Sequence, residues 1–310
     1  MTRSLHIVGN VQLDVLAGPV DRLPRPGGDD VIDHISVRPA GAAGNVSLAL
    51  AALGVEHRLF GAVGDDQAGR WVADELRKLG LARDLHVVAG RETGISIALE
   101  APGRERAFIT AHGVLTDYGV ESLPEDAIAA DFVLLTGYFS LPAFRGRGTQ
   151  QLLRRARHAG AFVALDTGWD PEDWSGSAAA EVLDLLPLID LFLPNEPEAL
   201  MLTGAATAEE ALELLAQRCG GWVVVKLGER GVLARGPAGH NVVLTAPVVT
   251  PKDTTGAGDS LAAGVLAELA RGVPMSDALV TGVRVASTVV GRDSLNRYPS
   301  WDQLVPMELA

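Results

Sequence analysis

The chain has 310 residues, of which 47% are hydrophobic and 21% charged; these values predict a sizeable core, in one large α/β domain with an appendage or in two domains. Its net charge of −13, with no run of basic residues, argues against nucleic acid as a partner. The single Cys219, an N-terminus that enters a strand pattern at once, and apolar stretches short of the ~20 residues of a membrane span predict a reduced, soluble, cytoplasmic protein.

Short apolar runs alternate with helical patterns along the chain. Strands are expected at residues 5–9, 58–63, 132–135, 162–165, 191–193 and 222–226, and helices at 44–53, 69–79, 149–158, 178–186 and 208–218. This alternation is typical of a mostly parallel sheet with helices on both faces. In such sheets, ligands bind in loops beyond the carboxyl ends of the strands.

Two segments interrupt the alternation. Residues 31–37 are extended in pattern, and residues 94–110 contain two alternating runs separated by Pro102-Gly103, which is the pattern of a hairpin. We expect these segments to form a small antiparallel flap inserted into the main domain. A flap beside an α/β active site suggests a lid that excludes water, and the alternative is a hairpin that only extends the sheet.

The most informative stretch is residues 253–260, DTTGAGDS, which opens into a long apolar helix. Glycines let backbone N–H groups approach a ligand closely, and a helix N-terminus supplies free donors with partial positive charge. Asp259 falls in the first turn, where it could accept the proton of an attacking hydroxyl. Taken alone, the same aspartate is also favoured there by the helix dipole.

These residues resemble a known family. Residues 253–266 are similar to the C-terminal signature of the ribokinase/PfkB family of carbohydrate kinases. Residues 40–47, AGAAGNVS, with Gly54 and Gly64 after them, resemble the N-terminal signature of the same family in residue type and spacing. The two motifs also stand in the family's order and at its separation, so the resemblance covers essentially the full length.

The resemblance implies one ribokinase-like domain over residues 1–310, a three-layer α/β/α sandwich with lid segments at about 11–38 and 92–112. It also implies ATP-dependent phosphorylation of a hydroxyl, expected to be a primary one, on a sugar or sugar-like substrate. In that reading Asp259 is the catalytic base, and Gly256, Ala257 and Gly258 form the anion hole.

The nucleotide side of the site is implied by three further elements. Asn195 and Glu198 resemble the family's Asn-x-x-Glu motif, which serves Mg²⁺ and the ATP phosphates, and Glu198 is expected to serve Mg²⁺ through water. Asn195 with Pro197 could equally cap a helix, and the two roles are compatible. Residues 226–231 resemble the strand-to-turn element that lines the nucleotide site. The expected nucleotide contacts are Asn195, Glu198, Lys226, Gly228, Gly231 and Thr254.

On the sugar side, residues 9–14 resemble the family's first strand and its acidic substrate ligand, here Asp14. Gly41 and Asn45 complete the implied pocket, with Gly41 also a hinge for lid closure. Asp253 and Thr255 are candidates for a monovalent-cation site, with K⁺ as the candidate ion, as in several members of the family. An exposed flap edge could pair two copies into a homodimer.

The chain departs from the family pattern in several places. Ala40 stands where many members have glycine, and Lys252 where an apolar residue is common. Residues 166–170 lack the Asn and Arg of relatives that act on 2-keto-3-deoxy acids or fructose, which argues against acidic sugars of that kind. Aromatic residues after strands could wall a substrate face or pack in the core; they are Tyr138, Phe139, Trp169 and Trp174.

Rival functions are weaker. The chain has no Gly-Lys dipeptide for a Walker loop, no Gly-x-Gly-x-x-Gly after the first strand, no zinc-ligand spacing among its seven histidines and no Gly-x-Ser-x-Gly elbow. A nucleoside kinase, which would need an apolar slot for the base, is the alternative within the kinase class. A sugar-binding pseudokinase is the alternative outside it, although every expected site residue is present.

Overall fold

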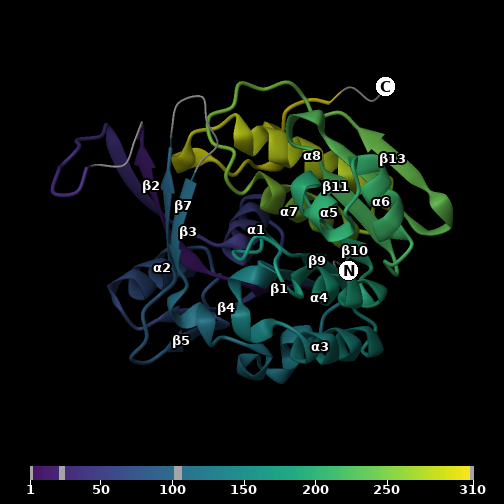
Figure 1. The fold of residues 1–310 in the computed structure, drawn as a ribbon, viewed down its shortest axis with the longest axis horizontal. Coiled ribbons are helices and arrows are strands. Elements are labelled where there is room, and N and C mark those ends of the chain that lie inside the picture. The colour runs from purple at the N-terminus through teal and green to yellow at the C-terminus, as the bar shows by residue number, and fades with distance from the viewer. Residues whose placement is uncertain (1–2, 21–24, 101–106, 308–310) are drawn as a thin grey trace.

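The computed structural model describes residues 3–20, 25–100 and 107–307. Its largest element is a nine-stranded sheet whose edges, β13 and β5, lie at opposite sides of the molecule (Figure 1). In order across the sheet, the strands are β13 (Asn241–Leu244), β12 (Val232–Arg235), β11 (Trp222–Lys226), β10 (Leu191–Phe192), β9 (Phe162–Asp166), β8 (Phe132–Thr136), β1 (Leu5–Gly9), β4 (Arg58–Gly64) and β5 (Leu85–Val88). The pairs are parallel except those that β12 makes with β11 and β13.

Eight α-helices lie in the described part of the chain. They are α1 (Ala42–Ala52), α2 (Gln67–Lys78), α3 (Arg147–His158), α4 (Ala178–Leu185), α5 (Glu196–Thr203), α6 (Ala208–Ala216), α7 (Ala257–Ala270) and α8 (Met275–Val290). Apolar residues of α1, α2, α7 and α8 join one core cluster, and those of α3 to α6 join a second. The helices therefore form two layers, one on each face of the sheet.

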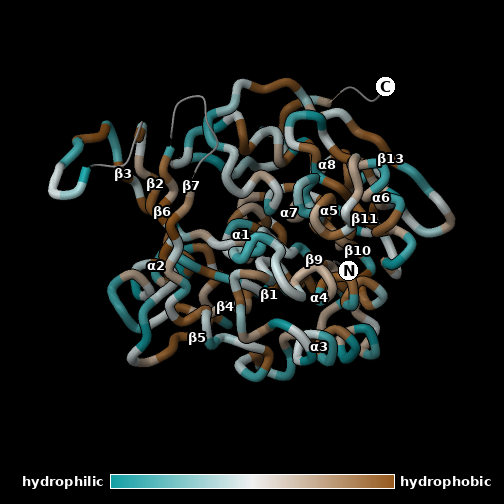
Figure 2. Tube along the Cα trace, viewed as in Figure 1, coloured by the Kyte–Doolittle hydropathy of each residue, from teal (hydrophilic) through white to brown (hydrophobic). Residues whose placement is uncertain are grey.

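The strands supply both clusters by alternation. In β8, Phe132 and Leu134 belong to the first cluster, whereas Val133 and Leu135 belong to the second. Successive side chains of a strand point to opposite faces, so a run buried on both faces reads as continuously apolar. Figure 2 shows these strands as largely apolar stretches in the interior, while α3 at the periphery is largely polar. The expected three-layer α/β/α sandwich is confirmed.

A second, smaller sheet projects at one end of the molecule (Figure 1). Its order is β3 (His34–Ala40), β2 (Gln12–Gly18), β6 (Ile95–Leu99) and β7 (Ala107–Ala111). The expected hairpin is present as the antiparallel pair β6–β7, and it does not extend the main sheet. Its expected turn, Pro102-Gly103, lies outside the described residues. We call this four-stranded sheet the lid.

Strand β2 was not predicted as a separate element, because it follows β1 after only two residues. The backbone nevertheless leaves the main sheet at Asn10 and pairs with β3 and β6. Elsewhere the predicted elements are correct to within a few residues. Helix α2 begins at Gln67 because the Asp66 side chain accepts from the Gly69 N–H at 2.8 Å and caps the helix. Within the described residues, no helix is both long and apolar enough to cross a membrane.

Candidate active site

The N-terminus of α7 lies at the centre of the candidate site. Gly256 adopts a left-handed conformation, with φ of 72°, and α7 begins at Ala257 with no side chain of the described residues capping it. A Cβ on Gly256 would lie 3.1 Å from the Asn45 Nδ2 atom, so glycine suits both the turn and the close approach. First-turn N–H groups have no acceptor within their own helix, although the Ala257 N–H also donates weakly to the Thr254 carbonyl at 3.3 Å. This end of α7 can therefore donate to an anion.

Asp259 lies in that first turn and is held by Asn45 of α1. The Asn45 Nδ2 atom donates to Asp259 Oδ2 at 2.8 Å, and Asn45 Oδ1 accepts from the Tyr298 hydroxyl at 3.0 Å. Burial, and then the nearby Asp166 carboxylate, raises the pKa of Asp259 to about 7, against the Asn45 bond that lowers it. Asp259 is thus an oriented carboxylate that gains and loses a proton near neutral pH.

Lys226 approaches the same turn from the end of β11. Its Nζ atom donates to Asp166 Oδ2 at 2.7 Å and lies 3.1 Å from where a Cβ on Gly258 would be. Burial alone would lower the pKa of Lys226, but the carboxylates of Asp166 and Glu198 outweigh it and raise that pKa. The ammonium is therefore charged and directly beside the backbone of Gly258.

Asn195 and Glu198 form a capping box at the start of α5. Asn195 Oδ1 accepts from the Glu198 N–H at 2.8 Å, and the Glu198 carboxylate accepts from the Asn195 N–H at 2.9 Å and from Asn195 Nδ2 at 2.8 Å. An isolated bridge between Asn195 and Lys226 places the box beside the lysine. Burial raises the pKa of Glu198 to about 7, opposed by Lys226 and assisted by Asp166.

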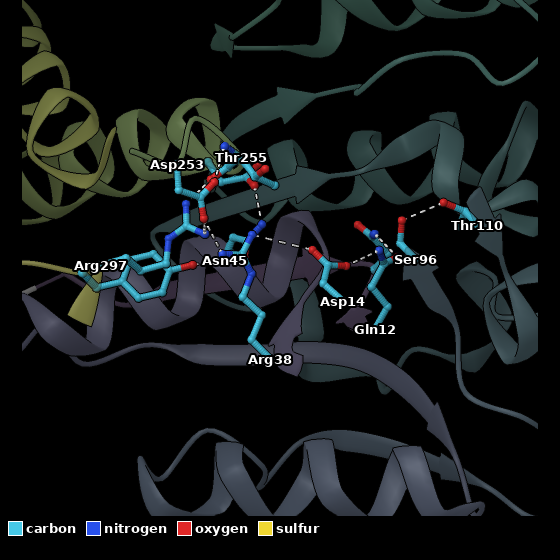
Figure 3. Close-up of polar contacts among 12 residues, drawn as sticks. Gln12, Asp14, Arg38, Asn45, Ser96, Thr110, Asp253, Thr255 and Arg297 are labelled. Carbon is cyan, nitrogen blue, oxygen red and sulfur yellow. Dashed lines mark hydrogen bonds and ion pairs between the residues drawn. The ribbon is translucent and has the colours of Figure 1, made fainter. Parts of the chain in front are cut away.

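The lid carries a row of polar side chains on one face. The strand register aligns Asp14 of β2 with Arg38 of β3 and with Ser96 of β6, and aligns Ser96 with Thr110 of β7. Ser96 and Thr110 share a hydrogen bond at 2.8 Å (Figure 3). Gln12 donates to Asp14 Oδ1 at 2.9 Å. Strand alternation thus places several side chains that can form hydrogen bonds with hydroxyl groups on one face of the lid.

Gly41 joins this lid to α1. It has a φ of 86° as the N-cap of α1, and a Cβ there would lie 2.4 Å from the Asn10 carbonyl oxygen. Asn45 follows one turn later in α1, and Asp14 lies on the lid strand that pairs with the chain just before Gly41. The structure therefore brings the three expected substrate residues to one junction between the lid and the main sheet.

Asp253 and Thr255 engage two arginines. Asp253 Oδ2 accepts from Arg38 Nη1 at 2.7 Å and from Arg297 Nη1 at 3.2 Å, and Arg297 Nη2 donates to the Thr255 carbonyl (Figure 3). Arg38 Nη2 also lies 3.9 Å from Asp14 Oδ2. The oxygens expected to ligate a monovalent cation are therefore in contact with guanidinium groups.

The remaining expected residues lie at the rim or in the core. Gly228 and Gly231, with φ of 62° and 94°, form the turn between β11 and β12, and Thr254 is exposed beside α7. Of the aromatic residues, Tyr138, Phe139 and Trp174 are buried in the second core cluster, whereas Trp169 is 46% exposed.

Sequence reasoning missed four residues that contact the site: Arg38, Asp166, Tyr298 and Arg297. Asp166 had the clearest signal, since it is a carboxylate at the carboxyl end of a buried parallel strand. Arg38 had a weaker one, as a charged residue within an alternating lid strand. Arg297 and Tyr298 follow the last helix in a stretch without a recognisable motif, and only tertiary contact reveals them.

Comparison with known proteins bears on this arrangement. The family described as pfkB family carbohydrate kinase matches residues 3–302. An ATP-dependent ribose-1-phosphate kinase of Halopiger xanaduensis is 30% identical over 95% of this chain and 94% of its own length. An uncharacterized sugar kinase of Escherichia coli, YegV, is 28% identical over 98% of this chain and 93% of its own.

Solved structures share the fold. A ribokinase of Arabidopsis thaliana, complexed with ribose and ATP, superposes with a TM-score of 0.81 at 23% identity, covering 98% of this chain and 97% of its own. A ribokinase of Thermotoga maritima superposes with a TM-score of 0.81 at 22% identity, covering 97% of both chains. The sandwich with its separate lid is therefore the fold of these proteins.

Proposed function

The chain belongs to the pfkB family of carbohydrate kinases, and from that premise we propose that it transfers the γ-phosphoryl group of ATP to a hydroxyl, a primary one, of a sugar or sugar-like substrate. The observation that carries this proposal is the environment of Asp259. An oriented carboxylate with a pKa of about 7 stands in the first turn of α7, beside the charged Lys226 and the backbone of Gly258. A base with a pKa near the working pH is suited to take a proton from a hydroxyl.

In the proposed reaction, the acceptor hydroxyl lies between Asp259 and the γ-phosphorus. Asp259 takes the hydroxyl proton, the oxygen forms a bond to the γ-phosphorus, and the bond to the bridging oxygen of ATP breaks to release ADP. The N–H groups of residues 256–258 face the equatorial oxygens of the transferring group. Lys226 adds a fixed positive charge there, so the protein contributes mainly position and electrostatic stabilisation.

The residues near Glu198 fit a magnesium ion held with ATP, though not by a ready-made cage. Among the residues that the structure describes, no group of three or more acidic, histidine or cysteine side chains is arranged so that it could hold a metal ion by itself. Three carboxylates, of Asp166, Glu198 and Asp259, instead surround the single Lys226, which favours further positive charge. We propose that Glu198 and Asn195 hold Mg²⁺ through water. When bound with ATP, it would neutralise phosphate charge.

The lid row supports a polyhydroxy substrate. Arg38 Nε and Nη2 are buried and have no hydrogen-bond acceptor in the described structure, and Nη2 lies 3.9 Å from Asp14 Oδ2. A donor and an acceptor side by side suit neighbouring hydroxyls of a sugar. Three of the four aromatic residues that could form a slot for a base are instead core residues, which favours a sugar over a nucleoside. The names of relatives include fructokinase and ribose-1-phosphate kinase.

The opposite face of the lid supports the proposal of a homodimer. Ile35, Val37 and Ile109 are 66%, 48% and 55% exposed on that face. Their alternation with the polar row places them away from the substrate side. Exposed apolar strands of this kind mark surfaces for association.

An ADP-release assay with MgATP and a panel of sugars, sugar phosphates, sugar acids, polyols and nucleosides tests the proposal. We expect one acceptor class to give turnover well above background ATP hydrolysis, and mass spectrometry to find one added phosphoryl group on that acceptor. Binding of an acceptor without turnover, in a protein that also binds ATP, would support the pseudokinase alternative. Failure to bind ATP would contradict the proposal itself.

A further inference from the structure

Arg297 stands where the resemblance led us to expect a monovalent cation. Its side chain is only 2% exposed, and it reaches the two residues named for that cation. One guanidinium nitrogen lies 3.2 Å from Asp253 Oδ2, and another donates to the Thr255 carbonyl. The buried group is thus a cation held by a carboxylate and a backbone oxygen, which are the kinds of ligand that a small cation would use.

The surrounding chain holds Arg297 in this place. It follows the short helical turn Ser294–Asn296 after α8, and its guanidinium carbon lies 5.2 Å from the centre of the Tyr298 ring. The Lys252 N–H donates to the Val290 carbonyl at 2.8 Å, and this bond connects the segment just before Asp253 to the end of α8. Arg297 is therefore positioned by packing from one side and by backbone contacts from the other.

The oxygens near Arg297 are engaged by donors. Asp253 Oδ1 accepts from the Thr255 N–H at 2.9 Å, and Asp253 Oδ2 accepts from both Arg297 and Arg38 (Figure 3). A potassium ion is bound in proteins by several oxygens that replace its water shell. Here two guanidinium groups use these oxygens, and their positive charge repels a further cation at contact distance. The arrangement does not fit a bound monovalent cation.

We propose that Arg297 takes the place of that monovalent cation as a built-in positive charge, so that the protein binds ATP and works without K⁺. Arg297 is a positioning residue in this proposal, because it acts through Asp253 and the Thr255 carbonyl. It fixes Asp253 and the Thr255 carbonyl, and through them the turn that presents the N–H groups of residues 256–258. That the protein works without K⁺ rests on the proposed kinase function, whereas the replacement of the bound cation by Arg297 does not.

The test compares the full-length protein in KCl, NaCl and tetramethylammonium chloride at equal ionic strength. Thermal unfolding and calorimetric binding of a non-hydrolysable ATP analogue are the readouts, and neither requires a known acceptor. We expect the affinity for the analogue to differ by less than about twofold among the three salts, with no specific rise of Tm in KCl. A rise of Tm and an affinity gain of about tenfold or more in KCl would overturn the proposal.

Variants of Arg297 sharpen the test. In Arg297→Ala the two oxygens lose their fixed cation, and we expect weaker analogue binding in tetramethylammonium chloride and a specific recovery in KCl. Arg297→Lys keeps a positive charge and should remain insensitive to KCl. Arg284→Ala is the matched control. The Arg284 side chain lies on α8 and, like that of Arg297, donates to backbone carbonyls, here those of Leu304 and Val305. It contacts no carboxylate in the described structure.

The outcomes separate the two proposals. If Arg297→Ala does not fold, the salt comparison on the wild-type protein and on Arg297→Lys still decides. A KCl response that Arg284→Ala shares with Arg297→Ala would be a general salt effect and would contradict the assignment to Arg297. If no salt allows the wild-type protein to bind the analogue, the kinase proposal fails, while the Tm comparison still tests whether Arg297 excludes K⁺.

Discussion

At the scale of single residues, the site depends on buried carboxylates whose desolvation is only partly offset by the positive charge of Lys226. Asp166, Glu198 and Asp259 share the charge of Lys226, and both Asp259 and Glu198 have a pKa raised to about 7 by burial in the first place. A carboxyl group that is charged at pH 4 in the unfolded chain but only near pH 7 in the folded protein destabilises the fold at higher pH. Two of these destabilising carboxyl groups, Glu198 and Asp259, lie where the proposed phosphoryl transfer would use them.

The raised pKa of Asp259 predicts a pH dependence. As a base it must be deprotonated, so kcat/KM for the acceptor should be highest above pH 7 and fall as the pH drops through about 7, because kcat/KM reports groups of the free enzyme. A pH series of initial rates at low acceptor concentration measures this limb. A plateau that extends down to about pH 5 would contradict the assignment of Asp259 as the base.

The positive charge of Lys226 should contribute to kcat/KM for ATP, beyond any contribution of the side chain to folding. Lys226→Met keeps most of the side-chain volume but leaves Asp166 without its donor, and it removes the positive charge beside Gly258. We expect kcat/KM for ATP to fall by about one to two orders of magnitude. Steady-state kinetics with ATP varied measure the effect. Lys252→Met is the control, because Lys252 is exposed and paired with Asp293 at 3.0 Å, and it should change kcat/KM little.

At the scale of elements, the site depends on the close packing of α7 against its neighbours. A Cβ on Gly264 would lie 2.9 Å from the Gly282 Cα, and one on Gly282 would lie 2.6 Å from Val265 Cγ2. Glycines at both positions let α7 and α8 approach closely, which fixes the direction of α7 and thus of its N-terminus. The polar turn 253–258 is held by this helix pair.

Gly282→Ala should therefore destabilise the protein, although alanine is the better helix former. Overpacking at this contact should cost about 1–3 kcal/mol in the free energy of unfolding, measured by denaturant titration. Gly44→Ala in α1 is the matched control: a Cβ there meets nothing within 4 Å, so the helix propensity of alanine should leave stability unchanged or raise it by roughly 0.5–1 kcal/mol. Equal effects of the two variants would contradict the packing argument.

At the scale of the whole molecule, the lid joins parts of the chain that are far apart. Arg38 and Asp253 are separated by 215 residues, yet their ion pair at 2.7 Å connects lid strand β3 to the start of α7. The lid also exposes Ile35, Val37 and Ile109 on the face opposite its polar row. Both features follow because the lid is a separate sheet that projects at one end of the molecule (Figure 1).

If this apolar face pairs two copies, sedimentation of the wild-type protein at micromolar concentration should show a dimer. Ile109→Asp should shift it to a monomer, because a charge would be buried without a partner in the interface. Phe108→Ser is the matched control, since Phe108 is 53% exposed but lies on the opposite lid face, and this variant should remain dimeric. A monomeric wild-type protein would contradict the proposed pairing.

Local patterns predicted most of the sandwich. Strands Leu5–Gly9 and Trp222–Lys226 have the predicted bounds, because buried parallel strands are continuous apolar runs that end at polar or glycine residues. Strand β2 was not predicted, since its pairing depends on β3 and β6 and not on its own sequence. The positions of Asp259 and Asn45 followed from two motifs, whereas the role of Arg297 depends on its contacts with Thr255 and with Asp253, which is 44 positions earlier.

The most direct measurement is phosphoryl transfer by Asp259→Asn, beside wild type and Asp277→Asn, with the acceptor found in the panel. Asp277 is an exposed aspartate in the first turn of α8, so Asp277→Asn removes a dipole-stabilising charge without touching the site. We expect Asp259→Asn to lower kcat by about two orders of magnitude or more with ATP binding largely retained, and Asp277→Asn to keep the wild-type kcat. Near wild-type kcat in Asp259→Asn would contradict the role of Asp259 as the base.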